Sequence, residues 1–161
     1  MASLPDENTL RIHAYATTAP GPRLIVLGGV HGDETCGTVG IERTLAELDS
    51  GALRLLRGQL TMVPVANPLA RRRQQREGER NLNRTFRPSD VPADYEDRIT
   101  NLLCPLLDRH DVLLDLHSFT SQSSGVLTST VWGDGLVDNP AGNPIAAGDL
   151  VRFIPFAELQ H

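Results

Sequence analysis

The sequence predicts an α/β fold in which a mostly parallel or mixed sheet is flanked by helices. Short runs rich in apolar residues, at 24–27, 59–66 and 112–116, have the length and composition of buried strands. The segments between them, at 35–48 and 94–109, carry apolar residues at helical spacing. Strands that alternate with helices are typical of a layered α/β domain, and 161 residues are enough to bury its core.

The first half of the chain is predicted to contain three strands and one helix. Residues 9–15 form the first strand, which ends before the turn-rich sequence at 19–22, and residues 24–27 form the second. The helix at 35–48 stops at Ser50-Gly51, because glycine is favoured just after a helix. The third strand, at 59–66, ends at Asn67-Pro68.

The second half begins with an Arg-rich segment at 70–92. It has no regular period, so we predict a long irregular loop, and such loops in compact domains are usually functional or mobile. A helix at 94–109 follows, and a buried strand at 112–116 then brings His117 to its end.

Three segments are expected along the chain. Residues 1–120 form the α/β core, 121–125 a linker or joint, and 126–161 a small β-rich C-terminal segment. The sequence Ser-Gln-Ser-Ser-Gly at 121–125 is typical of a linker. The strands expected after it lie at 126–132 and 150–156.

Charge and composition argue against several classes of function. A net charge of −5 disfavours a nucleic-acid or anionic-membrane binder, and all 15 basic residues are arginine. Cys36 and Cys104 are the only cysteines and form no Cys-x-x-Cys pair, which predicts reduced thiols. No apolar run approaches the length of about 20 residues that spans a bilayer. Because residues 1–8 also lack the apolar part of a signal peptide, we expect a soluble cytoplasmic protein.

Two histidines and a glutamate stand where predicted strands end. His31 and Glu34 follow the strand at 24–27, and His117 follows the strand at 112–116. Because the carboxyl ends of parallel strands meet at one edge of a sheet, we expect these side chains to lie close together. Two imidazoles and one carboxylate suit a catalytic Zn²⁺ with water in the fourth position. Asp33 and Asp115 are candidates to orient these ligands, and the alternative is that both histidines are ordinary loop residues.

Four short motifs strengthen the metal hypothesis because they occur together in order. They are Gly-Val-His-Gly-Asp-Glu at 29–34, Asn-Pro at 67–68, Asn-Leu-Asn-Arg at 81–84 and Asp-Leu-His-Ser at 115–118. This pattern resembles the succinylglutamate desuccinylase/aspartoacylase family of zinc-dependent amidohydrolases, which are related to the zinc carboxypeptidases. The resemblance covers residues 24–120. It implies a zinc carboxypeptidase-like core that holds one Zn²⁺ per chain through His31, Glu34 and His117.

The resemblance also implies roles for residues of the Arg-rich segment. Arg76, Asn83 and Arg84 match the family positions that contact the substrate or polarise its scissile carbonyl, and guanidinium groups suit carboxylate-bearing substrates. Asn81 stands where the family commonly has Asp. The other arginines of this segment are predicted to form a solvated basic surface; they are Arg71, Arg72, Arg73, Arg80 and Arg87.

The general base of the family is a glutamate placed after the third zinc ligand, and this sequence shows no counterpart for it. The only glutamate beyond His117 is Glu158. Residues 144–159 resemble the C-terminal end of family members, so the chain is predicted to be shortened after the Asp-Leu-His motif, with 121–125 as the joint. The catalytic residue is therefore left unassigned.

We predict a zinc-dependent hydrolase that cleaves the amide bond of small, carboxylate-bearing N-acyl amino acids with metal-activated water. The alternative is a shortened, catalytically weak or inactive zinc-binding relative that binds a small anion or a partner chain. A nucleic-acid binder is disfavoured by the acidic net charge and the lack of aromatic residues among the arginines. Homo-oligomer formation is left open as a way to cover an exposed sheet edge.

Overall fold

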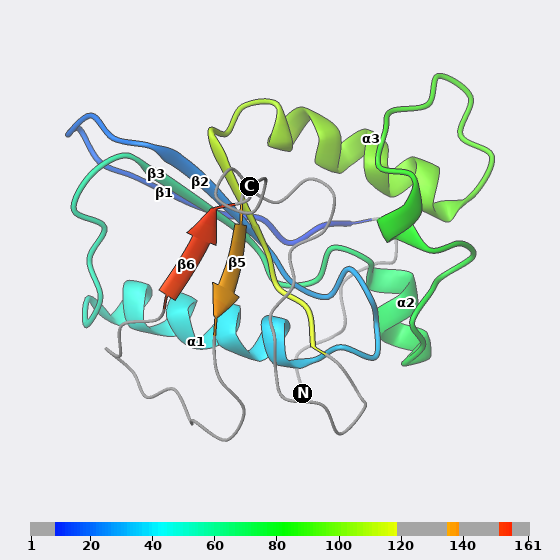
Figure 1. Cartoon of the computed structure of the whole chain (residues 1–161), viewed down its shortest axis with the longest axis horizontal. Coiled ribbons are helices and arrows are strands. Elements are labelled where there is room, and N and C mark those ends of the chain that lie inside the picture. Colours follow the sequence, from blue (N-terminus) through cyan, green and yellow to red (C-terminus); the bar gives the residue numbers. More distant parts are fainter. Residues whose placement is uncertain (1–8, 119–134, 139–151, 156–161) are drawn as a thin grey trace.

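The computed structural model describes residues 9–118, 135–138 and 152–155, and its core is a four-stranded sheet with helices on both faces (Figure 1). The strands are β1 (His13–Ala16), β2 (Arg23–Leu27), β3 (Gln59–Val63) and β4 (Val112–Asp115). The helices are α1 (Cys36–Ser50), α2 (Pro68–Arg73), the 3₁₀ helix η1 (Leu82–Arg84) and α3 (Tyr95–Leu107). The strand order is β1-β3-β2-β4; β2 runs parallel to β3 and β4, and β1 runs antiparallel to β3. The predicted α/β class with a mixed sheet is confirmed.

Strand β2 shows why the sheet is covered on both faces. Its side chains alternate, because successive residues of a strand point to opposite faces. Ile25 and Leu27 join a buried cluster that includes Leu103 of α3. Val26 joins a second cluster with Ile41 of α1. A strand buried on both faces is apolar throughout, which is the pattern that predicted it.

Proline sets two strand boundaries that differ from the prediction. β3 ends at Val63 rather than at residue 66, because Pro64 has no N–H to donate to a neighbouring strand. β1 starts at His13 rather than at residue 9. The antiparallel register pairs His13 with Met62, so residue 11 would lie opposite Pro64 and the ladder stops before it.

The prediction of one irregular loop across residues 70–92 is wrong in two places. Asn67 caps α2 by accepting a hydrogen bond from the N–H of Ala70, and Pro68 occupies the first helical position. Asn81 caps η1 by accepting from the N–H of Asn83. The Asn-Pro pair that follows β3 therefore also starts a helix. No helix within the described ranges is long and apolar enough to cross a membrane.

Beyond residue 118 the structure describes one antiparallel pair, β5 (Gly135–Asp138) and β6 (Arg152–Pro155). β6 falls inside the strand predicted at 150–156, whereas β5 was not expected. The strand predicted at 126–132 and the linker at 121–125 lie outside the described residues. The division at residues 120 and 125 therefore stays a prediction.

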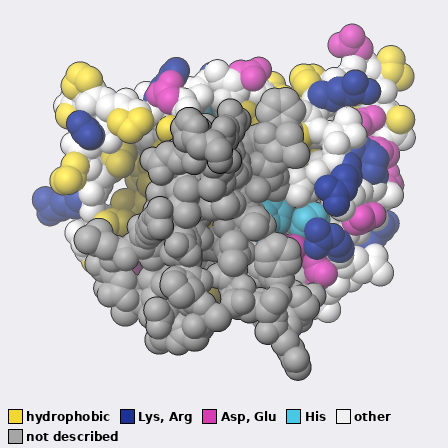
Figure 2. Space-filling view, in the orientation of Figure 1, with side chains coloured by type: hydrophobic (Ala, Val, Ile, Leu, Met, Phe, Trp, Pro, Cys, Tyr) yellow, Lys and Arg dark blue, Asp and Glu magenta, His cyan; other side chains and the backbone are white. Residues whose placement is uncertain are grey.

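The carboxyl ends of β2, β3 and β4 lie at the same edge of the sheet. Backbone hydrogen bonds continue past the strands there: Gly28 donates to Val63 at 2.9 Å, and Leu116 donates to Leu27 at 2.9 Å. These bonds hold the segment that follows β2 against the end of β3, and the segment that follows β4 against the end of β2. On the face shown in Figure 2, histidine side chains are visible beside arginines and carboxylates.

The turn after β2 packs directly against the backbone of α2. A Cβ atom on Gly32 would lie 2.0 Å from the carbonyl carbon of Ala70 and 2.1 Å from its oxygen. Only glycine permits this approach, so the position of residues 31–34 depends on α2.

We expect Gly32→Ala to destabilise the protein by roughly 3 kcal/mol, because the obstructing backbone cannot move aside as a flexible side chain would. Gly40→Ala is the matched control. Nothing lies within 4 Å of a Cβ there, and alanine in the α1 helix should stabilise by about 0.5–1 kcal/mol. Urea unfolding measures both changes, and equal stability of the two variants would contradict the packing described.

Candidate metal centre

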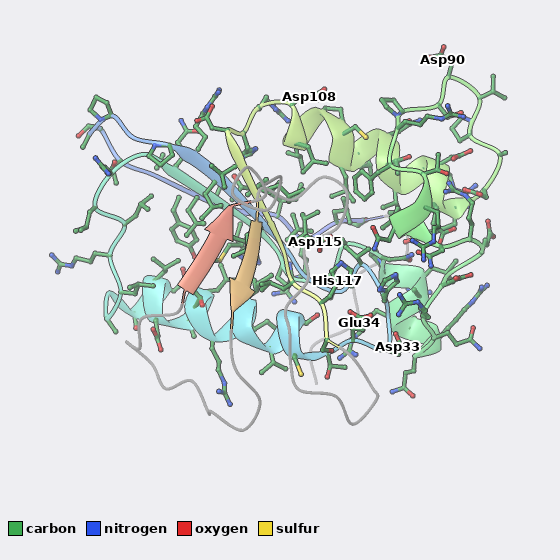
Figure 3. All side chains as sticks on the ribbon, viewed as in Figure 1. Asp33, Glu34, Asp90, Asp108, Asp115 and His117 are labelled. Atoms are coloured by element: carbon green, nitrogen blue, oxygen red, sulfur yellow. The ribbon has the colours of Figure 1, made fainter. Side chains whose placement is uncertain are left out.

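His31, Glu34 and His117 come together at the carboxyl edge of the sheet. His31 and Glu34 lie in the turn after β2, and His117 follows the neighbouring strand β4. One nitrogen or oxygen of each side chain lies within 4.8 Å of the others, and the three residues are 1%, 4% and 5% exposed. Figure 3 shows Glu34 and His117 close to each other, with Asp115 beside His117. The expected proximity is therefore observed.

The carboxylate of Glu34 is the centre of this cluster. Its Oε1 lies 2.8 Å from Nδ1 of His31 and accepts a hydrogen bond from Nη1 of Arg76 at 3.0 Å. Its Oε2 lies 3.0 Å from Nδ1 of His117 and accepts from the backbone N–H of Ser118 at 2.9 Å. Glu34 thus links the turn after β2, the Arg-rich segment and the end of β4.

The outer nitrogens of both histidines face hydrogen-bond acceptors. Nε2 of His31 lies 3.2 Å from Oδ1 of Asn81, and Nε2 of His117 lies 3.0 Å from Oδ2 of Asp115. The backbone N–H of Asn83 donates a hydrogen bond to the same side-chain atom of Asn81, so this atom is the amide oxygen and not the amide nitrogen. These acceptors favour protonated Nε2 atoms and direct both Nδ1 atoms toward Glu34.

This arrangement can hold a proton on each Nδ1 atom or a metal ion at its centre. If Nδ1 of either histidine carried no proton, its lone pair would face a lone pair of the Glu34 carboxylate, and the two would repel each other. A proton or a metal ion between the imidazoles and the carboxylate removes that repulsion. Two imidazole nitrogens and one carboxylate oxygen are also the donor set that Zn²⁺ accepts, so the residues present fit the predicted metal.

Electrostatics show how the metal-free site is stabilised. Burial lowers the pKa of His117, but hydrogen bonds to Asp115 and Glu34 outweigh burial and raise this pKa to about 9. Burial raises the pKa of the Glu34 carboxyl, but hydrogen bonds from His117, His31 and the N–H of Ser118 hold this pKa well below its ordinary value. At neutral pH the metal-free site therefore carries a proton on His117 next to an ionised Glu34.

One of the three residues expected to bind substrate touches the cluster. Arg76 pairs with Glu34 while its side chain remains 48% exposed. Asn83 lies in η1 beside Asn81, and Arg84 is exposed at the end of that helix. Within residues 9–118, no hydrogen bond or ion pair joins the Asn83 side chain or Arg84 to the metal-site residues. The substrate-binding roles stay predictions.

Two expectations about neighbouring residues differ from the structure. Arg80, expected to be solvated, forms ion pairs with Asp94 at 2.6 Å and Asp97 at 2.8 Å and so holds its segment against α3. Asp33, expected to orient a ligand, is exposed and forms no hydrogen bond with the part of the chain that the structure describes. Asp115 alone of the two aspartates contacts a histidine of the site.

Sequence reasoning missed the partner of His31 and a buried acid behind the Arg-rich segment. Asn81 was singled out only as a departure from the family pattern, although it lies beside the Asn83-Arg84 pair that the motif contains. Glu96 is fully buried and binds the backbone of residues 78–80. No signal in the sequence marks it, because acidic residues are ordinary in the first turn of a helix.

The fold and the cluster together define the class: an α/β protein with a buried His-Glu-His site suited to one metal ion. The family model for the succinylglutamate desuccinylase/aspartoacylase catalytic domain matches residues 20–131. This match covers more than half of the chain and contains all three residues of the cluster, and the chain belongs to this family.

Individual relatives agree with the family assignment. N-alpha-acetyl-L-2,4-diaminobutyric acid deacetylase of Halomonas elongata is 34% identical over an alignment of 106 residues, and the match covers 61% of this chain and 29% of that relative. An aspartoacylase family protein from Mesorhizobium loti is similar in structure, with a TM-score of 0.62 and 32% identity over 68% of this chain and 35% of that one. The product-bound ectoine utilization protein EutE from Ruegeria pomeroyi has a TM-score of 0.57 and 27% identity over 66% of this chain and 32% of that one. The chain spans about a third of the length of these relatives.

We expect the metal-free protein to be most stable between about pH 4.5 and pH 6.5. The raised pKa of His117 means that its stabilising charge is complete below pH 6.5 and is lost as the pH rises through about 9. The lowered pKa of Glu34 means that its contribution is present above pH 4.5 and is lost as the pH falls. Urea unfolding with a chelator, from pH 5.5 to 9.5, tests the alkaline side. The His117→Gln variant should lack most of this decline, and an equally steep decline in that variant would contradict the assignment.

Proposed function

We propose that the protein is a zinc-dependent hydrolase that cleaves the amide bond of small N-acyl amino acids. The observation that carries the proposal is the convergence of His31, Glu34 and His117, whose ligand atoms lie close enough together to hold one metal ion. Zinc bound there would supply a water molecule whose pKa is lowered toward about 7, so that hydroxide is present at neutral pH. The family of the chain supports hydrolytic chemistry of this kind.

The chain's own residues would prepare the site for that chemistry. Asn81 and Asp115 hold the Nε2 atoms of the two histidines and leave both Nδ1 atoms directed at one point. Ordered imidazoles lose little freedom when they bind a metal, and partners of this kind typically contribute tenfold to a hundredfold in metal affinity. The buried surroundings of the ligands also limit competition from bulk water.

The Arg-rich segment supports a substrate that carries carboxylates. Arg76 places a half-exposed guanidinium beside Glu34, at the border between the buried site and solvent. A planar guanidinium forms two parallel hydrogen bonds with a carboxylate, whereas an ammonium group does not. The relative from Halomonas elongata is a deacetylase of an N-acetylated amino acid, which favours the same chemical class for this chain.

The second candidate is a zinc-binding relative with weak or no turnover that binds a small anion or a partner chain. It is favoured by the state of the nearby carboxylates. Glu34 and Asp115, the carboxylates in contact with these histidines, are both already bound to imidazoles. The general base is therefore unassigned. The cytoplasmic location and the homo-oligomer stay predictions.

We expect the chain to bind one Zn²⁺, and single substitutions of His31 or His117 by alanine should reduce bound zinc to near zero. Each removes one of the three protein ligands that hold a catalytic zinc. His13→Ala is the matched control, because His13 lies on β1 away from the cluster. Elemental analysis after dialysis measures the zinc content. Retention of full zinc by either site variant would rule out this centre.

Zinc-loaded protein should release free amino acid from N-acyl amino acids, and Arg84→Gln should raise KM about tenfold or more. A charge-assisted hydrogen bond to the substrate carboxylate contributes about 1.5–3 kcal/mol, which corresponds to such a change. Arg87→Gln is the control, since Arg87 is also exposed but lies outside the family motif. Zinc binding without turnover on any acyl group would favour the second candidate, and equal KM values for both variants would exclude Arg84 from the substrate site.

A further inference from the structure

Glu96 is a fully buried carboxylate at the start of α3, and the proposed function does not use it. Its Oε1 accepts hydrogen bonds from Nδ2 of Asn67 at 3.0 Å and from the N–H of Gly78 at 3.1 Å. Its Oε2 accepts from the N–H of Arg80 at 3.0 Å, and both oxygens lie 3.2 Å from the nitrogen of Glu79. Four N–H donors therefore replace the water that this carboxylate gives up on burial.

The backbone of residues 78–80 is shaped around this carboxylate. Three successive N–H groups point at one anion, an arrangement that backbone amides form around bound anionic groups. A Cβ atom on Gly78 would lie 2.4 Å from Oε1 of Glu96. The loop approaches the carboxylate this closely only because residue 78 is glycine.

Capping of α3 does not explain the burial of Glu96. The side chain of Asp94 caps that helix by accepting from the N–H of Asp97 at 2.7 Å. The carboxylate of Glu79 accepts from the N–H of Tyr95 at 2.7 Å. The N–H groups of Tyr95 and Asp97 are thus bound by other acids, while the Glu96 side chain binds the loop.

The bound loop carries two residues that touch the proposed metal ligands. Arg76 lies two positions before Gly78 and donates to Glu34 at 3.0 Å. Asn81 follows Arg80 directly, and its Oδ1 lies 3.2 Å from Nε2 of His31. The backbone that Glu96 holds therefore lies between the two contacts from this loop to the metal centre.

We propose that Glu96 is a positioning residue for the metal centre. Its carboxylate holds residues 78–80 in place, and so keeps Asn81 against His31 and Arg76 against Glu34. Asn67 extends the same link toward the turn that contains His31, because its N–H donates to the carbonyl of Gly29 at 3.0 Å. The inference concerns the geometry of the site, and only its zinc measurement rests on the proposed function.

The test compares Glu96→Gln with Glu77→Gln, which changes an exposed glutamate of the same loop. The amide of glutamine keeps one acceptor oxygen but sets an NH₂ group against backbone N–H donors. In metal-free protein, the side-chain ¹⁵N resonances of His31 should shift in the Glu96 variant and stay unchanged in the Glu77 variant. Zinc affinity should fall about tenfold in the Glu96 variant and should equal that of the wild type in the Glu77 variant.

A second variant covers the case in which Glu96→Gln does not fold. Gly78→Ala pushes the loop away from the carboxylate without altering a buried charge, and it should shift the same His31 resonances. The double variants with Asn81→Ala should show no further shift of the His31 resonances, because Asn81 is the residue of this loop that contacts His31.

Two outcomes separate this inference from the proposed function. Unchanged His31 resonances in the folded variants, with only a lower melting temperature, would overturn the positioning role and leave the zinc proposal standing. Absence of zinc binding in the wild type, together with His31 shifts in Glu96→Gln or Gly78→Ala, would overturn the zinc proposal and support the positioning role.

Discussion

The carboxylate of Glu34 is the interaction on which the arrangement of the site depends. It accepts from or contacts four nitrogen atoms, contributed by the turn after β2, the Arg-rich segment and the end of β4. The residues that supply these nitrogens all lie outside the helices and strands, so the sheet alone does not hold them together. A buried carboxylate is stable only while its partners remain in place. The positions of these partners are therefore coupled, because the loss of any one of them leaves the buried charge less well compensated.

Two glutamates are buried in the part of the chain that the structure describes, and they serve different purposes. All donors to Glu96 are amide N–H groups, which carry their protons permanently, so that carboxylate is fully satisfied without any ion. Glu34 instead faces two imidazole nitrogens, which can give up their protons. The same residue type is therefore a structural anchor in one case and part of the proposed metal site in the other. Burial alone does not distinguish them; the chemistry of the partners does.

The parts of the structure that depend on local patterns were predictable from the sequence. The apolar runs of β2 and β4 identified buried parallel strands, and parallel pairing then implied that His31 and His117 would meet. The structure of residues 70–92 was not predictable in this way. It depends on the buried carboxylate of Glu96, which lies 16 to 18 residues along the chain from the N–H groups that it binds. A periodic pattern of apolar residues does not predict a contact of this kind. The start of β1 likewise depends on its register against Pro64.

The distance along the chain between the site residues has a mechanical consequence. Glu34 and His117 are separated by 83 residues, and a metal ion held by both would act as a reversible cross-link between the two ends of the core. Cross-links that close loops of this length remove on the order of 4–5 kcal/mol of chain entropy from the unfolded state. Metal binding and the pairing of β2 with β4 would then be coupled. A chain in which β4 has separated from β2 would have no metal site, and a bound metal ion would keep those strands paired.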